Sequence, residues 1–140
     1  MVISLPSLAA NIYTASKQLI SGSDFNNLSA QLNSGQDGIT AGAGGTQALA
    51  YQLNKAVNVI ATVVTGNDSV KLPKGILGLE VWIQNAAAAN SAQVFTYGKG
   101  TINNTDGAAT GVALAASVAG ATMYKCIDIT AAAGDVWVSK

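Results

Sequence analysis

The side chains that most often carry catalysis are few in this sequence, and they are spread along it. Its 140 residues include seven acidic side chains, seven lysines, one cysteine, and neither histidine nor arginine. General acid–base catalysis usually needs histidine, or two carboxylates held close together, whereas the acidic residues here occur singly, mostly beside predicted turns. One cysteine without histidine cannot form a zinc site. We therefore expect a protein that is not an enzyme and that uses no metal and no cofactor.

The glycine-rich stretch GKGTINNTDG, residues 98–107, is the segment that most suggests phosphate binding. It lacks the spacing of the P-loop and of the dinucleotide-binding motif, and its Asn-Asn and Asp-Gly pairs are typical of turns. It therefore predicts a hairpin loop. Charged residues make up 10% of the chain and the net charge is zero. The basic surface that nucleic acid binding needs is therefore missing, and we expect no direct nucleic acid partner.

The low charge also indicates association. Soluble domains carry about 25% charged residues, and a neutral, weakly charged surface is poorly protected against association. We therefore expect contacts with other subunits. The N-terminal sequence MVISLPSLAANIY has no basic region like that of a signal peptide. No stretch approaches the roughly 20 apolar residues that cross a bilayer, so we expect a protein made in the cytoplasm, with no membrane partner.

Residues 1–43 are expected to form an N-terminal arm. PSLAANIYTASKQLI has apolar residues at near-helical spacing, and SDFNNLSAQLNSG repeats the pattern, which predicts two short helices. Such helices are too short to be stable alone. They should dock on their own domain or on a neighbour, through a set of apolar residues that includes Leu8, Ile12, Phe25 and Leu28. The glycine-rich segment GQDGITAGAGG, residues 35–45, is expected to be a flexible loop or a hinge that lets the arm reach another subunit.

The pattern of residues 44–140 is that of a β domain. β-branched runs such as AVNVIATVVT, residues 56–65, alternate with turns rich in glycine, asparagine and aspartate. About eight short strands follow one another at regular spacing. This series predicts a mainly β fold: an antiparallel β-sandwich, a jelly roll or a small barrel.

Two tryptophans raise the question of what covers them. In LEVWIQ, residues 79–84, Trp82 shares its side of the strand with Glu80, and in DVWVS, residues 135–139, Trp137 shares its side with Asp135. Both indoles are therefore expected on the polar side of their strands. Three arrangements could place them there: a second packed layer or a covering loop, a subunit interface, where aromatic residues are enriched, and a sugar-stacking platform.

Five residues near predicted turns are interpreted as fold determinants. Pro73 after Leu72 ends a strand and presets the backbone of a turn. Gly78 permits a tight re-entry into the next strand. The amides of Asn85 and Asn103 follow strands, where they can bind loop backbone.

Several short motifs follow one another within residues 44–140: GGTQALA, VNVIATV, DSVKLP, LEVWIQN, GKGTIN with Asn103, and a terminal strand that contains Trp137. Their order resembles that in a β-rich module of tailed-phage virion proteins. The module occurs in small capsid decoration (cement) proteins and at the tips of phage tails. The resemblance implies a homotrimeric β-sandwich or jelly roll, and residues 1–43 lie outside it.

The resemblance implies a structural protein of a bacteriophage virion. The leading hypothesis is a capsid decoration protein that trimerises and stabilises the phage head by bridging capsomers. Its partners are then other copies of itself and the major capsid protein, its location is the capsid surface, and Trp82 and Trp137 join the apolar residues of the arm at the interfaces. The alternative is a receptor-binding module of a tail fibre or tail tip that binds a host glycan through Trp82, Tyr97 or Trp137. A free-standing lectin is a third interpretation, which the missing export signal disfavours.

Overall fold

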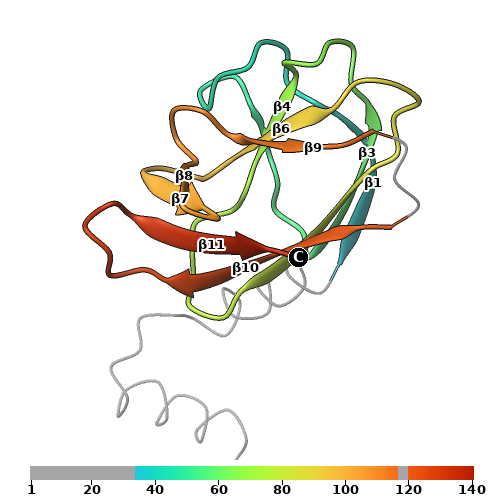
Figure 1. The fold of residues 1–140 in the computed structure, drawn as a ribbon. Helices are drawn as coiled ribbons and strands as arrows, with labels where there is room; N and C mark the ends of the chain where they lie inside the picture. Colours follow the sequence, from blue (N-terminus) through green and yellow to red (C-terminus); the bar gives the residue numbers. More distant parts are fainter. Residues whose placement is uncertain (1–33, 117–119) are drawn as a thin grey trace, which may run out of the picture. The chain divides into compact units, whose positions relative to one another are not determined.

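The backbone of the described residues forms two β-sheets (Figure 1). The computed structural model describes residues 34–116 and 120–140, and within them it contains strands and turns but no α-helix. The strands are β1 (Gly35–Thr40), β2 (Tyr51–Gln52), β3 (Val57–Thr62), β4 (Ser69–Lys71), β5 (Glu80–Asn85), β6 (Ala92–Phe95), β7 (Gly100–Ile102), β8 (Thr105–Asp106), β9 (Val112–Leu114), β10 (Thr122–Asp128) and β11 (Asp135–Ser139). The predicted mainly β fold is thus confirmed for these residues.

Consecutive strands of the first half of the chain belong alternately to the two sheets. The larger sheet has the strand order β1-β3-β5-β10-β11-β7-β8, and the smaller has the order β2-β4-β6-β9. After each strand the chain forms one strand of the other sheet and then returns to the first sheet. The returning strand runs parallel to the strand two places before it, as in the pairs β1–β3, β3–β5, β2–β4 and β4–β6.

The second half of the chain adds most of the antiparallel pairs. β10 lies between β5 and β11 and is antiparallel to both, β9 is antiparallel to β6, and β8 is antiparallel to β7, whereas β7 and β11 are parallel. The prediction of an antiparallel fold is therefore wrong for five of the nine strand pairs described. Hairpin turns and turns that cross to a facing sheet use the same glycine, asparagine and aspartate residues, so turn spacing alone does not distinguish them.

Both sheets contribute side chains to one apolar core. Burial of apolar surface, at about 25 cal/mol for each Å² removed from water, is the main favourable term in such a fold. The fully buried side chains of the core include Ile60, Val81, Ile83, Ile102, Cys126 and Trp137 from the larger sheet, and Val70, Ala92 and Val94 from the smaller.

The glycine-rich segment that begins at Gly35 belongs to the larger sheet and is not a free hinge. Residues 35–40 form β1, which pairs with β3, and Ile39 is only 2% exposed. Gln36 donates a hydrogen bond from Nε2 to the Tyr51 hydroxyl at 2.7 Å. The predicted domain boundary at residue 44 therefore lies inside the β fold, because buried side chains between the glycines anchor this segment.

Trp137 lies in the core and not at the surface of the chain. Its side chain is fully buried, opposite Cys126 of β10 and Ile102 of β7. The alternation predicted for DVWVS is present, but its inner and outer sides are reversed. The polar residues that share the inner side are satisfied by hydrogen bonds at the two ends of the strand: Asp135 accepts one from the Gly75 N–H at 2.7 Å, and the Ser139 hydroxyl accepts one from Asn103.

The turn that carries the chain from β3 to β4 is closed by the buried carboxylate of Asp68. It accepts hydrogen bonds from the Thr65 hydroxyl at 2.7 Å, from the Val64 N–H at 2.7 Å and from the Thr65 N–H at 3.1 Å. These bonds, that of the Thr65 hydroxyl above all, hold the pKa of Asp68 below its ordinary value, although burial acts in the opposite direction.

Replacing each tryptophan in turn tests the reversed phase of β11. Trp137→Ala leaves a cavity in the core and should lower the free energy of unfolding by about 3–5 kcal/mol. Trp82→Ala, on a side chain that is 40% exposed, should lower it by about 1 kcal/mol. Urea unfolding followed by circular dichroism measures both values. Equal losses in the two variants would contradict the burial of Trp137, and Trp137→Phe serves if the alanine variant does not fold.

The hydrogen bonds of Asp68 predict a dependence of stability on pH. A carboxyl whose pKa is lowered by folding stabilises the protein above its unfolded-state pKa, near 3.9, and this contribution is lost as the pH falls through the lower folded-state pKa. At neutral pH, Asp68→Asn should reduce the free energy of unfolding by roughly 1–3 kcal/mol. The difference between variant and wild type should shrink in acid. Urea unfolding of both proteins from neutral pH into acid measures this difference in the free energy of unfolding. A difference that is constant with pH argues against the interpretation.

Candidate functional site

Trp82 lies on the outer face of the larger sheet, which we define as the side of that sheet opposite the core. Its neighbours along β5, Val81 and Ile83, are fully buried, whereas Trp82 is 40% exposed. The alternation predicted for LEVWIQ is therefore confirmed in the structure. The indole is partly accessible at the surface of this chain.

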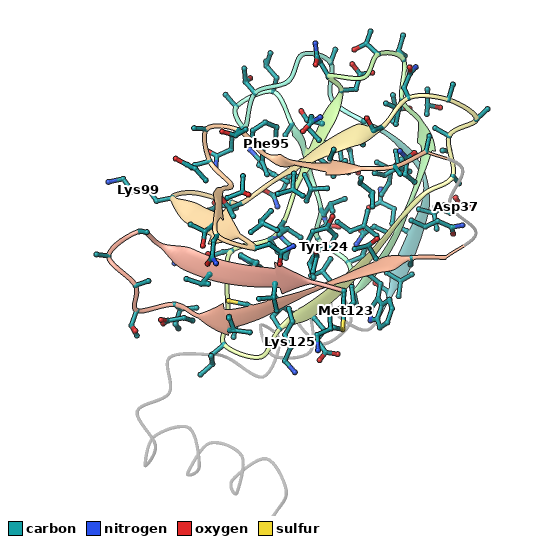
Figure 2. The ribbon with its side chains drawn as sticks, in the orientation of Figure 1. Asp37, Phe95, Lys99, Met123, Tyr124 and Lys125 are labelled. Carbon is teal, nitrogen blue, oxygen red and sulfur yellow. The ribbon has the colours of Figure 1, made fainter. Side chains whose placement is uncertain are left out.

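Strand register places an apolar side chain on each side of Trp82. Val57 of β3 is its partner in the parallel pair, and Met123 of β10 is its partner in the antiparallel pair. Val57 is 46% exposed and Met123 is half-buried. Figure 2 shows Tyr124 directed toward the smaller sheet and Met123 on the opposite side of β10. We call Val57, Trp82 and Met123 the apolar row.

The residues that border the apolar row present little net charge. Gly35 is the register partner of Val57 on the far side and has no side chain. Lys125 and Glu80 form an exposed ion pair with an Nζ–Oε1 distance of 2.9 Å. Such exposed pairs contribute little to stability, but here the two charges compensate each other. Val138 continues the outer face as the register partner of Lys125.

The apolar row brings partly exposed apolar side chains together on one face of the larger sheet. Single exposed apolar residues are common and need no explanation, whereas contiguous apolar patches mark interaction sites. Interfaces are also enriched in aromatic residues and methionine and depleted in charge at their centre. The row combines an indole, a methionine and a valine across three adjacent strands. None of these three side chains is an acid or a base.

The three aromatic residues considered for a glycan platform do not lie on one surface. Trp137 is buried, Trp82 is on the outer face of the larger sheet, and Tyr97, which is 51% exposed, follows β6 of the smaller sheet. Trp137 was also predicted at an interface, but its indole fills the core and is not at the surface of this chain.

The predicted fold determinants around β4 and β5 lie at crossings between sheets. Leu72 is fully buried, and its N–H donates to the Phe95 carbonyl at 2.9 Å. Pro73 follows it at the end of β4. Gly78 has a positive φ of 85° and donates its N–H to the Cys126 carbonyl at 2.8 Å. A residue with a Cβ would be strained at that φ.

The two predicted asparagines bind backbone from other segments. Asn85 is fully buried, and its Nδ2 donates to the carbonyls of Asn90 and Leu114, each at 3.1 Å. Leu114 belongs to β9, so this amide links the two sheets. Asn103 donates to the Ser139 hydroxyl at 2.7 Å and accepts from the Ser139 N–H at 2.9 Å, which ties the β7–β8 hairpin to β11.

Several acidic side chains of the described residues bind separate stretches of backbone. Asp106, Asp128 and Asp135 each accept a hydrogen bond from nearby backbone N–H groups, as Asp68 does. Within residues 34–116 and 120–140, no group of three or more histidine, cysteine, aspartate or glutamate side chains could hold a metal ion. Cys126 is buried in β10, and its burial raises the pKa of its thiol.

Part of the predicted interface belongs to the N-terminal segment. Leu8, Ile12, Phe25 and Leu28, together with the two predicted helices, lie outside the described residues. In the part of the chain that is described, no helix is long and apolar enough to cross a membrane.

Sequence reasoning identified Trp82 but missed its two partners in the row. Val57 and Met123 are far from Trp82 along the chain and reach it only through strand register. The alternation of VNVIAT, in which Val57 and Val59 oppose Asn58 and Ile60, was the available signal. It was ambiguous, because it places apolar residues on both sides of the strand and because the polar Asn58 is the buried one.

Comparisons with known proteins found no relative of this chain. The chain matches no family model. No curated protein and no solved structure matches it either.

Proposed function

We propose that this chain is a structural protein of a tailed-phage virion, and specifically a capsid decoration protein. In this proposal three copies associate, and the trimer bridges neighbouring capsomers of the head. The protein performs no reaction; it stabilises the shell because many copies bury surface across the joints. The observation that carries the proposal is the apolar row of Val57, Trp82 and Met123 on the outer face of the larger sheet.

The composition of the surface supports association. Only 10% of the residues are charged and the net charge is zero, so that electrostatic repulsion between copies is weak. Specific and stable contacts bury about 1,200–2,000 Å² in total, and symmetric repetition multiplies a contact over an assembly. In the proposed trimer, the apolar row lies at the contact between copies.

The arrangement of the sheets is compatible with this role. We interpret the two sheets with their common core as a β-sandwich, as the resemblance to the virion module implies. The larger sheet then supplies the contact between copies. The apolar residues predicted in the N-terminal segment, among them Leu8 and Phe25, are assigned to the contact with the major capsid protein.

A charge in the apolar row tests the contact between copies. Trp82→Lys should shift the chain from a trimer toward a monomer, because burial of an unpaired ammonium group is costly. The loss should amount to at least about 1.4 kcal/mol for each contact, or tenfold in its dissociation constant. Sedimentation equilibrium over a range of concentrations measures the mass of the assembly.

Tyr97→Lys is the matched control for this experiment, because it replaces another exposed aromatic residue that lies outside the row. The control should retain the mass of the wild-type assembly. A wild-type chain that is monomeric at every concentration would argue against the proposal, as would a Trp82→Lys variant with an unchanged mass.

The location of the protein tests the role on the capsid. Shells assembled from the cognate major capsid protein should bind the chain to saturation and resist heat or chelation longer when it is bound. Gel densitometry of purified virions should give a copy number comparable with that of the major capsid protein. A handful of copies per particle points instead to the tail, and absence from the particle excludes both locations.

A further inference from the structure

A pocket of about 400 Å³ lies where the β7–β8 hairpin meets the loop between β10 and β11. Figure 1 shows these two segments at the same end of the sheets. The volume is within the range of about 300–1,000 Å³ that is usual for small-molecule sites. No residue of the apolar row lines it. The residues that do include four with polar side chains, Lys99, Thr101, Asn104 and Asp106, and three alanines, Ala108, Ala132 and Ala133.

One wall of the pocket depends on two glycines that allow backbone segments to touch. Gly134 has a φ of 95°, and a Cβ at this position would collide with the carbonyl oxygen of Lys99. A Cβ on Gly100 would lie 2.5 Å from the carbonyl oxygen of Asp135. The Asp135 N–H donates to that Lys99 carbonyl at 3.2 Å. The β10–β11 loop is therefore held directly against the start of β7.

The other wall is the hairpin between β7 and β8. Asn103 and Asn104 form its two-residue turn with φ values of 50° and 66°, the positive values of a type I′ turn, in which asparagine is favoured. The hydrogen bonds of Asn103 to Ser139 hold the turn in place. The side chain of Asn104 makes no hydrogen bond with the described residues and lines the pocket.

The carboxylate of Asp106 is held in place and still has an oxygen available. Its Oδ1 accepts hydrogen bonds from the N–H groups of Ala108 at 2.9 Å and of Ala109 at 3.0 Å. Its Oδ2 has no hydrogen bond with the part of the chain that is described. The Thr101 hydroxyl and the Lys99 ammonium also have no hydrogen bond with the described residues. Among these residues, Lys99 forms no ion pair with Asp106.

These groups suit a ligand that is neutral and rich in hydroxyl groups. A saccharide hydroxyl can donate to the Asp106 carboxylate and accept from the Lys99 ammonium, and the Asn104 amide and the Thr101 hydroxyl can do both. The alanine methyl groups offer a surface for the C–H face of a sugar ring. The single lysine is offset by the carboxylate, which disfavours phosphate, and one carboxylate is too few for Mg²⁺ or Ca²⁺.

We propose that this pocket binds a neutral saccharide through Lys99, Thr101, Asn104 and Asp106. The site is distinct from the aromatic platform considered in the sequence, since neither tryptophan nor Tyr97 lines it. It does not rest on the proposed role in the capsid, because the pocket is formed within one chain. Loss of association therefore leaves this proposal intact, and loss of saccharide binding leaves the role in the capsid intact.

Titration of the isotope-labelled full-length chain with maltose and with N,N′-diacetylchitobiose tests the proposal. Amide NMR spectra should show shifts at the pocket residues, Thr101, Asn104 and Ala133 among them, with at least one of the two disaccharides. The dissociation constant should be on the order of 1 mM or lower, as befits an open pocket with few contacts. Inorganic phosphate should not shift the same amides.

Two substitutions assign the binding to the named side chains. Asp106→Asn keeps the oxygen that caps the backbone of Ala108 and Ala109 but removes the free carboxylate oxygen, and it should weaken binding roughly tenfold. Thr101→Val should weaken it measurably. Thr105→Val is the matched control on the same hairpin: Thr105 is exposed and does not line the pocket, so its affinity should equal that of the wild type.

Four results would overturn the proposal. They are the absence of shifts with both disaccharides, shifts centred on Trp82 or Tyr97, competition by phosphate at the pocket amides, and full affinity in both Asp106→Asn and Thr101→Val. Spectra of each variant without ligand establish that it is folded. If Asp106→Asn alters that spectrum, the comparison of Thr101→Val with Thr105→Val decides.

Discussion

The fold of this chain depends on its repeated crossing between two sheets. From β1 to β6 every connection moves from one sheet to the other, and facing sheets are about 10 Å apart. Each crossing therefore places polar backbone close to the core, where it needs partners. The chain supplies them from short polar side chains: Asp68 binds the turn after β3, and Asn85 links the end of β5 to β9. Parallel pairing follows from this path, because each strand re-enters its sheet in the same direction.

The outer face of the larger sheet carries apolar side chains beside the Lys125–Glu80 ion pair. The inner side of each strand is occupied by core residues such as Ile60 and Ile83, so the alternate positions point outward. In β3, β5 and β10 several of these positions are also apolar. The described residues leave Val57 and Trp82 partly exposed there. These partly exposed side chains would gain free energy if another surface removed them from water.

The sequence predicts the β content and the phase of β5, because Val81 and Ile83 alternate there with Glu80, Trp82 and Gln84, which are polar or amphipathic. The prediction of the phase fails for β11. Val136 and Val138 lie on the side opposite Trp137, so either side of this strand could face the core. The size of the indole and the hydrogen bonds to Asp135 and Ser139 decide the orientation. The apolar row and the pocket were also beyond prediction, because strand register and glycine contacts between distant segments create them.

The apolar row and the pocket depend on different physical effects, and they are formed by different residues. The apolar row gains stability when water is excluded, so it favours an occupant that stays bound. The pocket is open and offers few contacts, so one copy should bind the proposed saccharide weakly. If many copies are held in one assembly by the first surface, the pockets are presented together, and their combined avidity can exceed the affinity of one pocket by orders of magnitude. Association through Trp82 would thus make a weak site at Asp106 effective without any further contact.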